Sequence, residues 1–365
     1  MRILAVTSSR VRIFFIFILW AATCIAKYKF NGEIFGFDYS NLQPDGKHYA
    51  FRTLIFMGNS ESDAARQVIT WYDQYAPRNS GFALSDMASS TNAVWGLVAP
   101  RVLYSILSIP FVWIFGLQGM LMIPALSLLA IYLSVDHLAK KMNAANLGTI
   151  LILLISCSTT IYRWMFSNCT DALLAGLFAL TVIVLQQSKG VKQNTNVLVL
   201  IFLSSITRFC LPIWIAISIF LFFRYSKRLA LVVLGAASLF SIPTFMTMPQ
   251  NTLIPSIQDA STVEKVLRLP ISLAKVTFVE FAELAVLDRV LLFMLLASLA
   301  ISIRNFRNDA SLLYLLVLGS VFLIGAINGT LGVNFRYQLP AIPFMALVFL
   351  KNSKSFSNFL KPLKN

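Results

Sequence analysis

The residues best suited to chemistry lie in one short polar stretch, residues 37–52, which follows the first hydrophobic segment. A carboxylate there could act as a general base that takes a proton from an attacking hydroxyl group. We take Asp45 as the candidate base, with Asp38 as the fallback carboxylate. His48 is either a second base or a solvated loop residue. The structural alternative for Asp45 is a simple turn, because Pro-Asp-Gly is a common turn sequence.

Arginines recur near the ends of later apolar segments, on the side where this stretch is expected to lie. Arginine binds phosphate through paired hydrogen bonds. Carboxylates together with several arginines therefore suit a substrate that carries a phosphate, and an acceptor whose hydroxyl group must lose a proton. Ionisable groups at the membrane are costly, so they usually serve function or pair with each other. The further candidates on this face are Tyr49, Arg52, Arg101, Arg163, Asp171, Arg208 and Arg336.

Structural roles for these residues stay open at this point. Asp171 precedes an apolar run, so it could cap a helix N-terminus, or it could pair with Arg163. Arg336 could anchor a membrane span at the lipid headgroups. Arg52 and Arg101 could pair with loop carboxylates and take no part in chemistry.

The composition predicts a membrane protein. Of the 365 residues, 58% are hydrophobic and only 12% are charged, and the mean hydropathy is +0.75. A soluble domain carries roughly 25% charged residues. The apolar segments are continuous rather than alternating, which favours helices over a β-barrel. We therefore expect an all-α, multi-pass protein of the lipid bilayer.

The net charge of +15 does not predict nucleic-acid binding, because no basic segment is interleaved with aromatic residues. The four cysteines, Cys24, Cys157, Cys169 and Cys210, form no CxxC pair and are expected to be small buried hydrophobes. With only two histidines, a zinc site is not expected. No cofactor is predicted, and dependence on a divalent metal ion stays open.

Ten spans with both termini in the cytoplasm fit the charge pattern best. The loops then assigned to the cytoplasm hold sixteen basic residues against Asp136 and Asp309 alone, as the positive-inside rule requires. A cleaved signal peptide is the alternative for the first segment. The expected spans are 13–26, 118–136, 146–162, 171–186, 197–208, 210–223, 229–248, 287–303, 311–331 and 338–350.

This topology gives one membrane domain, residues 1–350, followed by a short basic tail, 351–365. The first outer loop, 27–117, should contain an interfacial helix from Ser60 to Tyr75. Residues 93–115 are expected to form a helix tucked against the outer interface or partly re-entrant, with a true span as the alternative. A second outer loop, 249–286, should contain interfacial helices at Val263–Leu269 and Ser272–Leu284.

Several short segments, spread over nearly the whole chain, resemble the GT-C superfamily of polyprenyl-phosphate-sugar-dependent glycosyltransferases. The resemblance is closest to protein O-mannosyltransferases and the lipid A aminoarabinose transferase. The segments that carry it are Pro44–Tyr49, Pro100–Tyr104 with Phe115-Gly116, Leu138–Lys141, Tyr162-Arg163 with Thr170–Leu174, Thr207-Arg208, and Arg336–Pro340.

The resemblance implies that Asp45 deprotonates the acceptor hydroxyl group, while Arg336, with Arg208 or Arg163, holds the lipid phosphate. It further implies inverting transfer to a glycolipid or envelope polysaccharide at the outer face of a bacterial inner membrane. The sequence departs from the family pattern in two ways: Gly46, not a second acidic residue, follows Asp45, and no large soluble C-terminal domain is seen. The competing functions are an O-antigen-type polymerase or ligase and a transporter or flippase. The latter would place ionisable residues at mid-membrane.

Overall fold

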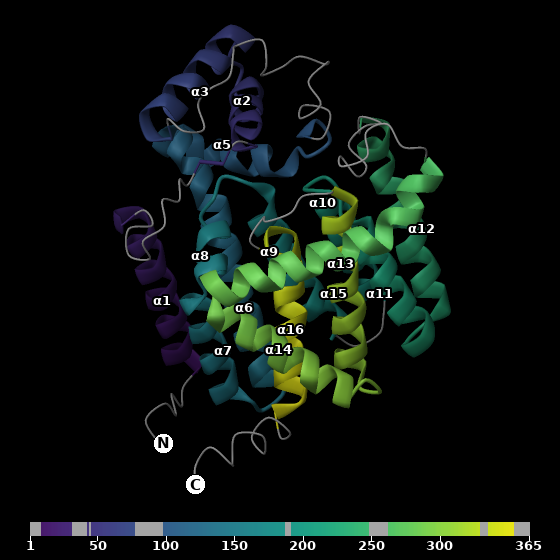
Figure 1. Ribbon diagram of the computed structural model, residues 1–365. Coiled ribbons are helices and arrows are strands. Elements are labelled where there is room, and N and C mark those ends of the chain that lie inside the picture. The colour runs from purple at the N-terminus through teal and green to yellow at the C-terminus, as the bar shows by residue number, and fades with distance from the viewer. Residues whose placement is uncertain are drawn as a thin grey trace.

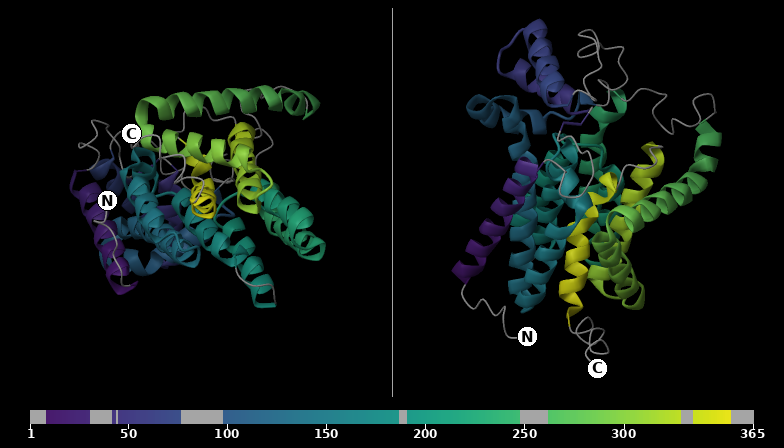
Figure 2. Two further views of the ribbon diagram at one scale, coloured as in Figure 1. Left: turned by 90° about the horizontal axis from the view of Figure 1, so that it is seen from below. Right: turned by 60° about the vertical axis from the view of Figure 1, so that its left-hand side comes forward.

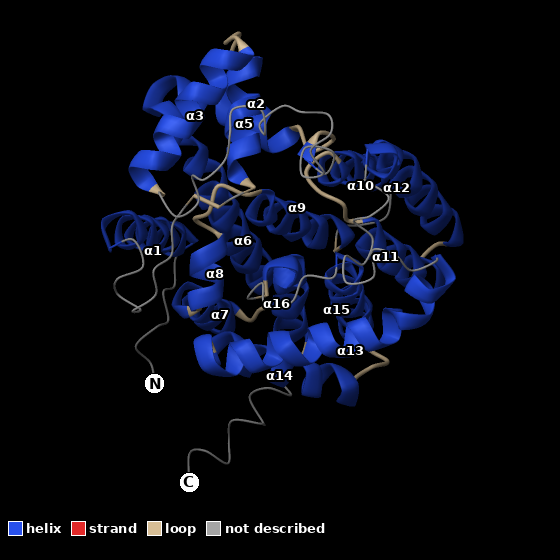
Figure 3. Ribbon diagram, turned by 45° about the horizontal axis from the view of Figure 1, so that its top comes forward, coloured by secondary structure: helices blue, strands red, loops and turns tan. Residues whose placement is uncertain are grey.

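The structure is a computed structural model that describes residues 9–30, 42–43, 45–76, 98–186, 191–247, 262–328 and 335–353. All regular structure in these residues is helical, and they contain no strand (Figure 3). The helices form one bundle, with a smaller group of helices at one end (Figure 1). Asp38, residues 93–97, much of the second outer loop and the tail beyond 353 lie outside the described residues.

Three helices build the smaller group, and they correspond to the first outer loop of the sequence. These are α2 (Gly46–Phe56), α3 (Glu61–Tyr75) and α5 (Leu103–Phe115). The helix predicted from Ser60 to Tyr75 is confirmed: Ser60 caps α3 by accepting a hydrogen bond from the Asp63 backbone N–H at 3.2 Å. Its apolar face is buried while its charged face is exposed, as expected of an interfacial helix.

The predicted Phe-Gly turn ends α5. Gly116 has a φ of +66°, a left-handed conformation that glycine adopts without the strain of a side chain. The chain then passes through the 3-10 helix η4 (Gly116–Leu121) into α6 (Met122–Lys141). Leu103–Lys141 is one apolar helical stretch, long enough to cross a membrane.

Each of the ten segments predicted as spans contains one helix of the bundle. The helices are α1 (Ser9–Phe30), α6, α7 (Ala145–Cys157), α9 (Thr170–Leu185), α10 (Val191–Ser205), α11 (Leu211–Arg224), α12 (Lys227–Thr247), α14 (Arg289–Arg304), α15 (Asp309–Asn328) and α16 (Ile342–Lys351). Two corrections follow. The third segment is divided at Ser158, where the short α8 (Thr159–Trp164) begins. The last segment opens with a 3-10 helix, η7 (Arg336–Ala341), rather than with α-helix.

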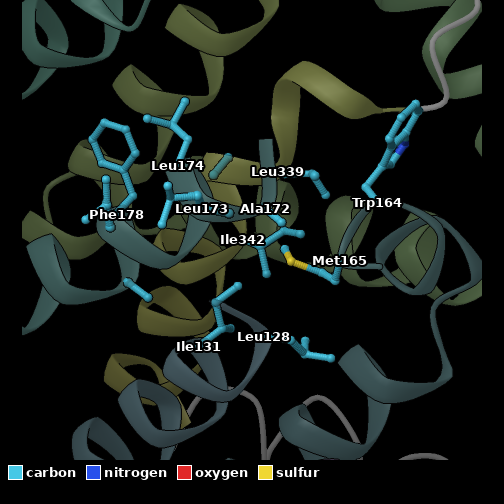
Figure 4. Close-up of a cluster of buried hydrophobic side chains, with 14 of the residues drawn as sticks. Leu128, Ile131, Trp164, Met165, Ala172, Leu173, Leu174, Phe178, Leu339 and Ile342 are labelled. Atoms are coloured by element: carbon cyan, nitrogen blue, oxygen red, sulfur yellow. The ribbon is translucent and has the colours of Figure 1, made fainter. Parts of the chain in front are cut away.

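Helices α9 and α16 form the centre of the bundle. Every residue of α9 is buried except Leu180 and Ile183, and all of α16 from Ile342 to Leu350 is buried. A helix that is apolar on all sides must be enclosed by other helices or by lipid. Side chains from α6, α9, η7 and α16 meet in this core, with Trp164 and Met165 at its edge (Figure 4).

The outside of the bundle is also apolar. Leu231, Leu239 and Ile242 of α12 and Phe14 of α1 are exposed, where a soluble protein would place polar groups. Besides Leu103–Lys141, the stretches Lys227–Thr244 and Asp309–Ile327 are long and apolar enough to span a membrane. Together these features indicate a membrane protein.

The two helices predicted in the second outer loop are one helix. Helix α13 (Thr262–Leu287) continues through Pro270 and runs obliquely across the bundle, in front of α15 and α16 (Figures 1 and 2). Its length allows it to touch several distant elements.

The expectation that all four cysteines are buried is only partly correct. Cys169 and Cys210 are buried, Cys24 is half-buried and Cys157 is exposed.

Candidate functional site

Four charged side chains from four separate elements form one connected network. Asp45 precedes α2, Asp171 lies in the first turn of α9, Arg208 follows α10, and Arg336 opens η7. The Arg336 Nη2 donates to Asp45 Oδ2 at 2.8 Å, and its Nε donates to Asp171 Oδ2 at 2.7 Å. Arg208 Nη1 donates to Asp171 Oδ1. One arginine thus joins the candidate base to the only other carboxylate of this network.

The network is buried at Asp171 and Arg336 and partly exposed at Asp45. The side chain of Asp171 is 2% exposed and that of Arg336 is 11% exposed, whereas that of Asp45 is 37% exposed. Partial burial opposes ionisation of Asp45, but the charges of Arg336, Arg208 and Arg101 outweigh it and lower its pKa to about 2. Asp45 is therefore an ionised carboxylate that incoming groups can reach.

Aromatic rings support the arginines. The guanidinium of Arg336 lies 5.1 Å from the centroid of the Trp164 ring, and that of Arg163 lies 4.8 Å from the same centroid. The guanidinium of Arg208 lies 4.5 Å from the Tyr337 ring. These are cation–π distances, which fix flat guanidinium groups in place. Trp164 thus brings Arg163 close to Arg336.

The partner expected for Asp171 was wrong. Its carboxylate pairs with Arg208 and Arg336, not with Arg163. Its capping role is also not observed: Cys169 occupies the N-cap position of α9, with Asp171 two residues further on. Arg336 is nearly buried within the ionic network, so the interpretation of it as a headgroup anchor does not describe its position.

Arg101 carries a buried positive charge that is close to Asp45 and has no carboxylate partner within the described residues. Its side chain is buried, and its Nη1 donates to the Tyr49 hydroxyl group at 3.3 Å. Its Nε has no hydrogen-bond partner. The Tyr49 hydroxyl also lies 3.4 Å from that of Thr170, at the start of α9. A buried charge left without a counter-charge is costly, so this position is suited to an anionic ligand.

Arg52 and His48 have different surroundings. Arg52 Nη1 donates to the carbonyl oxygens of Val98 and Ala99, at 2.9 and 2.7 Å, and so ties α2 to the turn before Arg101. His48 is 1% exposed and lies inside α2. The interpretation of His48 as a solvated loop residue is therefore wrong.

The turn that carries Asp45 is fixed by Asn168, a residue that the sequence reasoning missed. The Asn168 side chain accepts from the Gln43 backbone N–H at 2.7 Å and donates to the Tyr72 hydroxyl group at 2.8 Å. That hydroxyl group donates to the Gln43 carbonyl at 2.6 Å. Asn168 is completely buried, so it acts inside the protein and not at its surface. Its only sequence signal was its place in a polar run, beside the Arg and Asp motifs.

Gly46 is explained by the same contact. A Cβ atom on Gly46 would lie 2.1 Å from Asn168 Nδ2, a distance that no side chain could occupy. The departure from a second acidic residue therefore has a steric cause. Asp45 itself is at the N-cap position of α2, but its carboxylate makes no capping hydrogen bond. The Gly46 backbone N–H donates to the Gln43 carbonyl, as expected of a turn, and the Asp45 carboxylate accepts a hydrogen bond from Arg336.

Among the described residues, no group of three or more His, Cys, Asp or Glu side chains is placed to hold a metal ion. Comparison of the chain with protein-family models, with curated proteins and with solved structures finds no match.

Proposed function

We propose that the protein is a multi-pass membrane glycosyltransferase of the GT-C type. It moves a sugar from a polyprenyl-phosphate carrier to a hydroxyl acceptor at the outer face of a bacterial inner membrane. The observation that carries this proposal is the hydrogen bond from Arg336 to Asp45, beside the buried cation of Arg101. It places a reachable carboxylate next to guanidinium groups that can hold phosphate.

The proposed reaction is a single displacement. The donor phosphate binds Arg336 and Arg101, and Asp45 accepts the proton of the acceptor hydroxyl group. The acceptor oxygen attacks the anomeric carbon as the bond from that carbon to the phosphate oxygen breaks. The phosphate leaves with the electron pair, and the configuration of the sugar inverts.

The charge of the site suits this leaving group. Four arginines, Arg101, Arg163, Arg208 and Arg336, are linked to or lie near two carboxylates, Asp45 and Asp171. Arg101 forms no ion pair with a carboxylate of the described residues, so its charge is available to an anionic ligand. A phosphodiester donor carries one negative charge and the departing phosphomonoester develops a second. Preorganised cations therefore stabilise the charge that appears in the transition state.

An apolar groove fits the lipid part of the donor. It has a volume of about 410 Å³ and is lined by residues of α5, α6 and α9, among them Ile106, Leu126 and Leu177. Arg101 lies just before α5, and Asp171 lies in the first turn of α9. The groove is therefore built by helices that also carry site residues, which suits an amphiphile with an anionic head.

The proposal takes the bundle to cross the membrane ten times. Helix α1 begins and α16 ends at the same end of the bundle, opposite α2 and α3 (Figure 1). Several helices, including α9, α11 and α16, are shorter than the ~20 residues of a simple span. The proposal requires a locally thinned bilayer or non-helical residues to complete those crossings.

A transporter or flippase would place its ionisable residues at mid-membrane, whereas Asp45, Arg208 and Arg336 belong to one network that begins beside α2, at one end of the bundle (Figure 1). This favours the transferase over the transporter.

Transfer of labelled sugar from polyprenyl-phosphate sugars to native membranes tests the proposal. Asp45→Asn should lower the rate by about 10²–10⁴-fold, the usual contribution of a general base. Asp73→Asn is the matched control, because Asp73 is an exposed carboxylate of α3. If the folded Asp45→Asn variant transferred sugar at the wild-type rate, Asp45 would not be the general base.

A further inference from the structure

The junction between α13 and α14 docks on the junction between α7 and α8. The Thr159 hydroxyl group donates to the Leu287 carbonyl, the last residue of α13, at 2.7 Å. The next residue, Asp288, accepts from the Ser158 hydroxyl group at 2.5 Å and from the Thr160 backbone N–H at 2.9 Å. Ser158 and Asp288 are both buried. Two elements more than a hundred residues apart are thus joined by one carboxylate.

Asp288 also caps its own helix. Its Oδ1 accepts from the Leu291 backbone N–H at 2.9 Å, while its Oδ2 serves the start of α8. A carboxylate can do this because both of its oxygens are acceptors. An asparagine in the same place would present N–H₂ to one of these donors. The position therefore selects an acid although no cation pairs with it among the described residues.

The contacts of Asp288 matter for the residues at the other end of α8. This helix has only six residues, and its last two are Arg163 and Trp164. Trp164 is the ring over which both Arg163 and Arg336 lie. So short a helix has little stability of its own. Its direction, and with it the place of Trp164, is set by what holds its first residues.

Helix α13 reaches Arg336 by a second route. The Glu280 carboxylate is completely buried and accepts from the Phe335 backbone N–H. Phe335 has a φ of +61°, a left-handed conformation that is strained for a bulky residue and must be held by its surroundings. Arg336 is the next residue. One helix thus supports both the arginine and the ring on which the arginine lies.

We propose that Asp288 is a positioning residue for phosphate binding. It fixes α8 so that Trp164 holds the guanidinium groups of Arg163 and Arg336 in the geometry that accepts a lipid-linked phosphate. This inference rests on the proposed function, because it takes the ligand to be a polyprenyl phosphate. It assigns Asp288 no contact with the substrate.

Binding of farnesyl phosphate to the full-length protein in detergent, measured by calorimetry, tests this role. Asp288→Asn should weaken binding roughly tenfold, the size of one lost, well-placed interaction. In the transfer assay the donor KM should rise, and kcat should fall as well, because the same guanidinium groups stabilise the charge of the departing phosphate. Asp309→Asn is the matched control: Asp309 also lies at the start of a helix, but its side chain is 67% exposed. It should bind like the wild type.

A double-mutant cycle separates positioning from general loss of structure. If Asp288 acts through the ring, Asp288→Asn should have little further effect on binding in a Trp164→Leu background. Additive losses would overturn the inference. Ser158→Ala removes one donor to Asp288 and replaces Asp288→Asn in the test if the latter does not fold. Wild-type affinity of Ser158→Ala would likewise overturn the inference.

The outcomes also distinguish the two proposals. Wild-type protein that binds no farnesyl phosphate would overturn both the proposed function and this role. Wild-type binding that Asp288→Asn leaves unchanged would overturn only the role of Asp288.

Discussion

Within the described residues, an ionic cluster around Asp136 and another around Arg336 lie at opposite ends of the bundle (Figure 1). Near the start of α1, Arg12 Nε donates to Asp136 Oδ1 at 2.9 Å, while Lys140 Nζ lies 2.6 Å from Asp136 Oδ2. Both cations are satisfied by one buried carboxylate. At the other end, Arg336 is held by Asp171 and by the partly exposed Asp45. A closed cluster joins helices, whereas an open one leaves groups with which a ligand can exchange.

The charge of Arg101 is a second difference between the two clusters. In the cluster of Arg12, the contact of Arg12 with Asp136 links α1 to α6, and the contact of Lys140 with Asp136 lies within α6, so the cluster needs no further molecule. Beside Asp45, the buried guanidinium of Arg101 has only a tyrosine hydroxyl as its partner among the described residues. Buried pairs contribute little net stability by themselves. A buried cation that pairs with no carboxylate of the described residues is therefore better evidence of a ligand site than a closed ion pair.

The largest expected difference comes from removing one arginine of each cluster. Arg336→Gln should weaken farnesyl phosphate binding about 100-fold, or ~2.7 kcal/mol, because a charge-assisted contact to the ligand is lost. Arg12→Gln should leave binding unchanged and lower the thermal midpoint, because it separates α1 from α6. Calorimetry and thermal unfolding check both. Equal loss of binding in the two variants would remove the distinction between the clusters.

A smaller difference separates two arginines of the same end. Arg101→Gln should weaken binding about tenfold without lowering the thermal midpoint, since it removes a buried charge that pairs with no carboxylate of the described residues. Arg52→Gln should lower the unfolding free energy by about 1–3 kcal/mol, because Arg52 holds two backbone carbonyls. Affinity and stability should be measured on the same preparations. A large stability loss in Arg101→Gln with unchanged affinity would make Arg101 structural.

The smallest effect is a pH dependence of stability. The pKa of Asp45 is lower in the folded protein, at about 2, than its ordinary value of 3.8. Its contribution is therefore present above about pH 4 and is lost as the pH falls towards 2. Because Asp45 is partly exposed, the contribution should be below about 1 kcal/mol. Denaturation of wild type and Asp45→Asn at pH 5, 4 and 3 measures it, and a difference that grew with acid would contradict it.

The helices could be predicted from the sequence because their signals are local. Apolar runs, the capping Ser60 and the Phe115-Gly116 turn each act within a few residues. Errors arose where a local rule was overridden. Two helices were predicted, at Val263–Leu269 and Ser272–Leu284, yet α13 continues from one to the other through Pro270. Ser158 ends one helix and caps the next within a run that reads as a single apolar segment.

The candidate site was predicted as a set of residues but not as a set of contacts. Asp45, Asp171, Arg208 and Arg336 were all expected on one face, and they form one network. Their pairing depends on the rotation and depth of α9 and η7 relative to each other, which a single sequence does not encode locally. The supports, such as Asn168 and Asp288, act across more than a hundred residues of chain. A polar residue next to an apolar run was their only signal.

The hydrogen bond between Arg336 and Asp45 has a kinetic consequence under the proposed reaction. One nitrogen of Arg336, its Nη2, holds the carboxylate, so a phosphate that takes this nitrogen must release Asp45. Asp45 then becomes a stronger base after the carrier has arrived, because the hydrogen bond that lowered its basicity is gone. Such a site would follow a compulsory order of addition, donor before acceptor. While no donor is bound, the carboxylate keeps its hydrogen bond to Arg336, which lowers its basicity. Water is then less readily activated to attack in place of the acceptor.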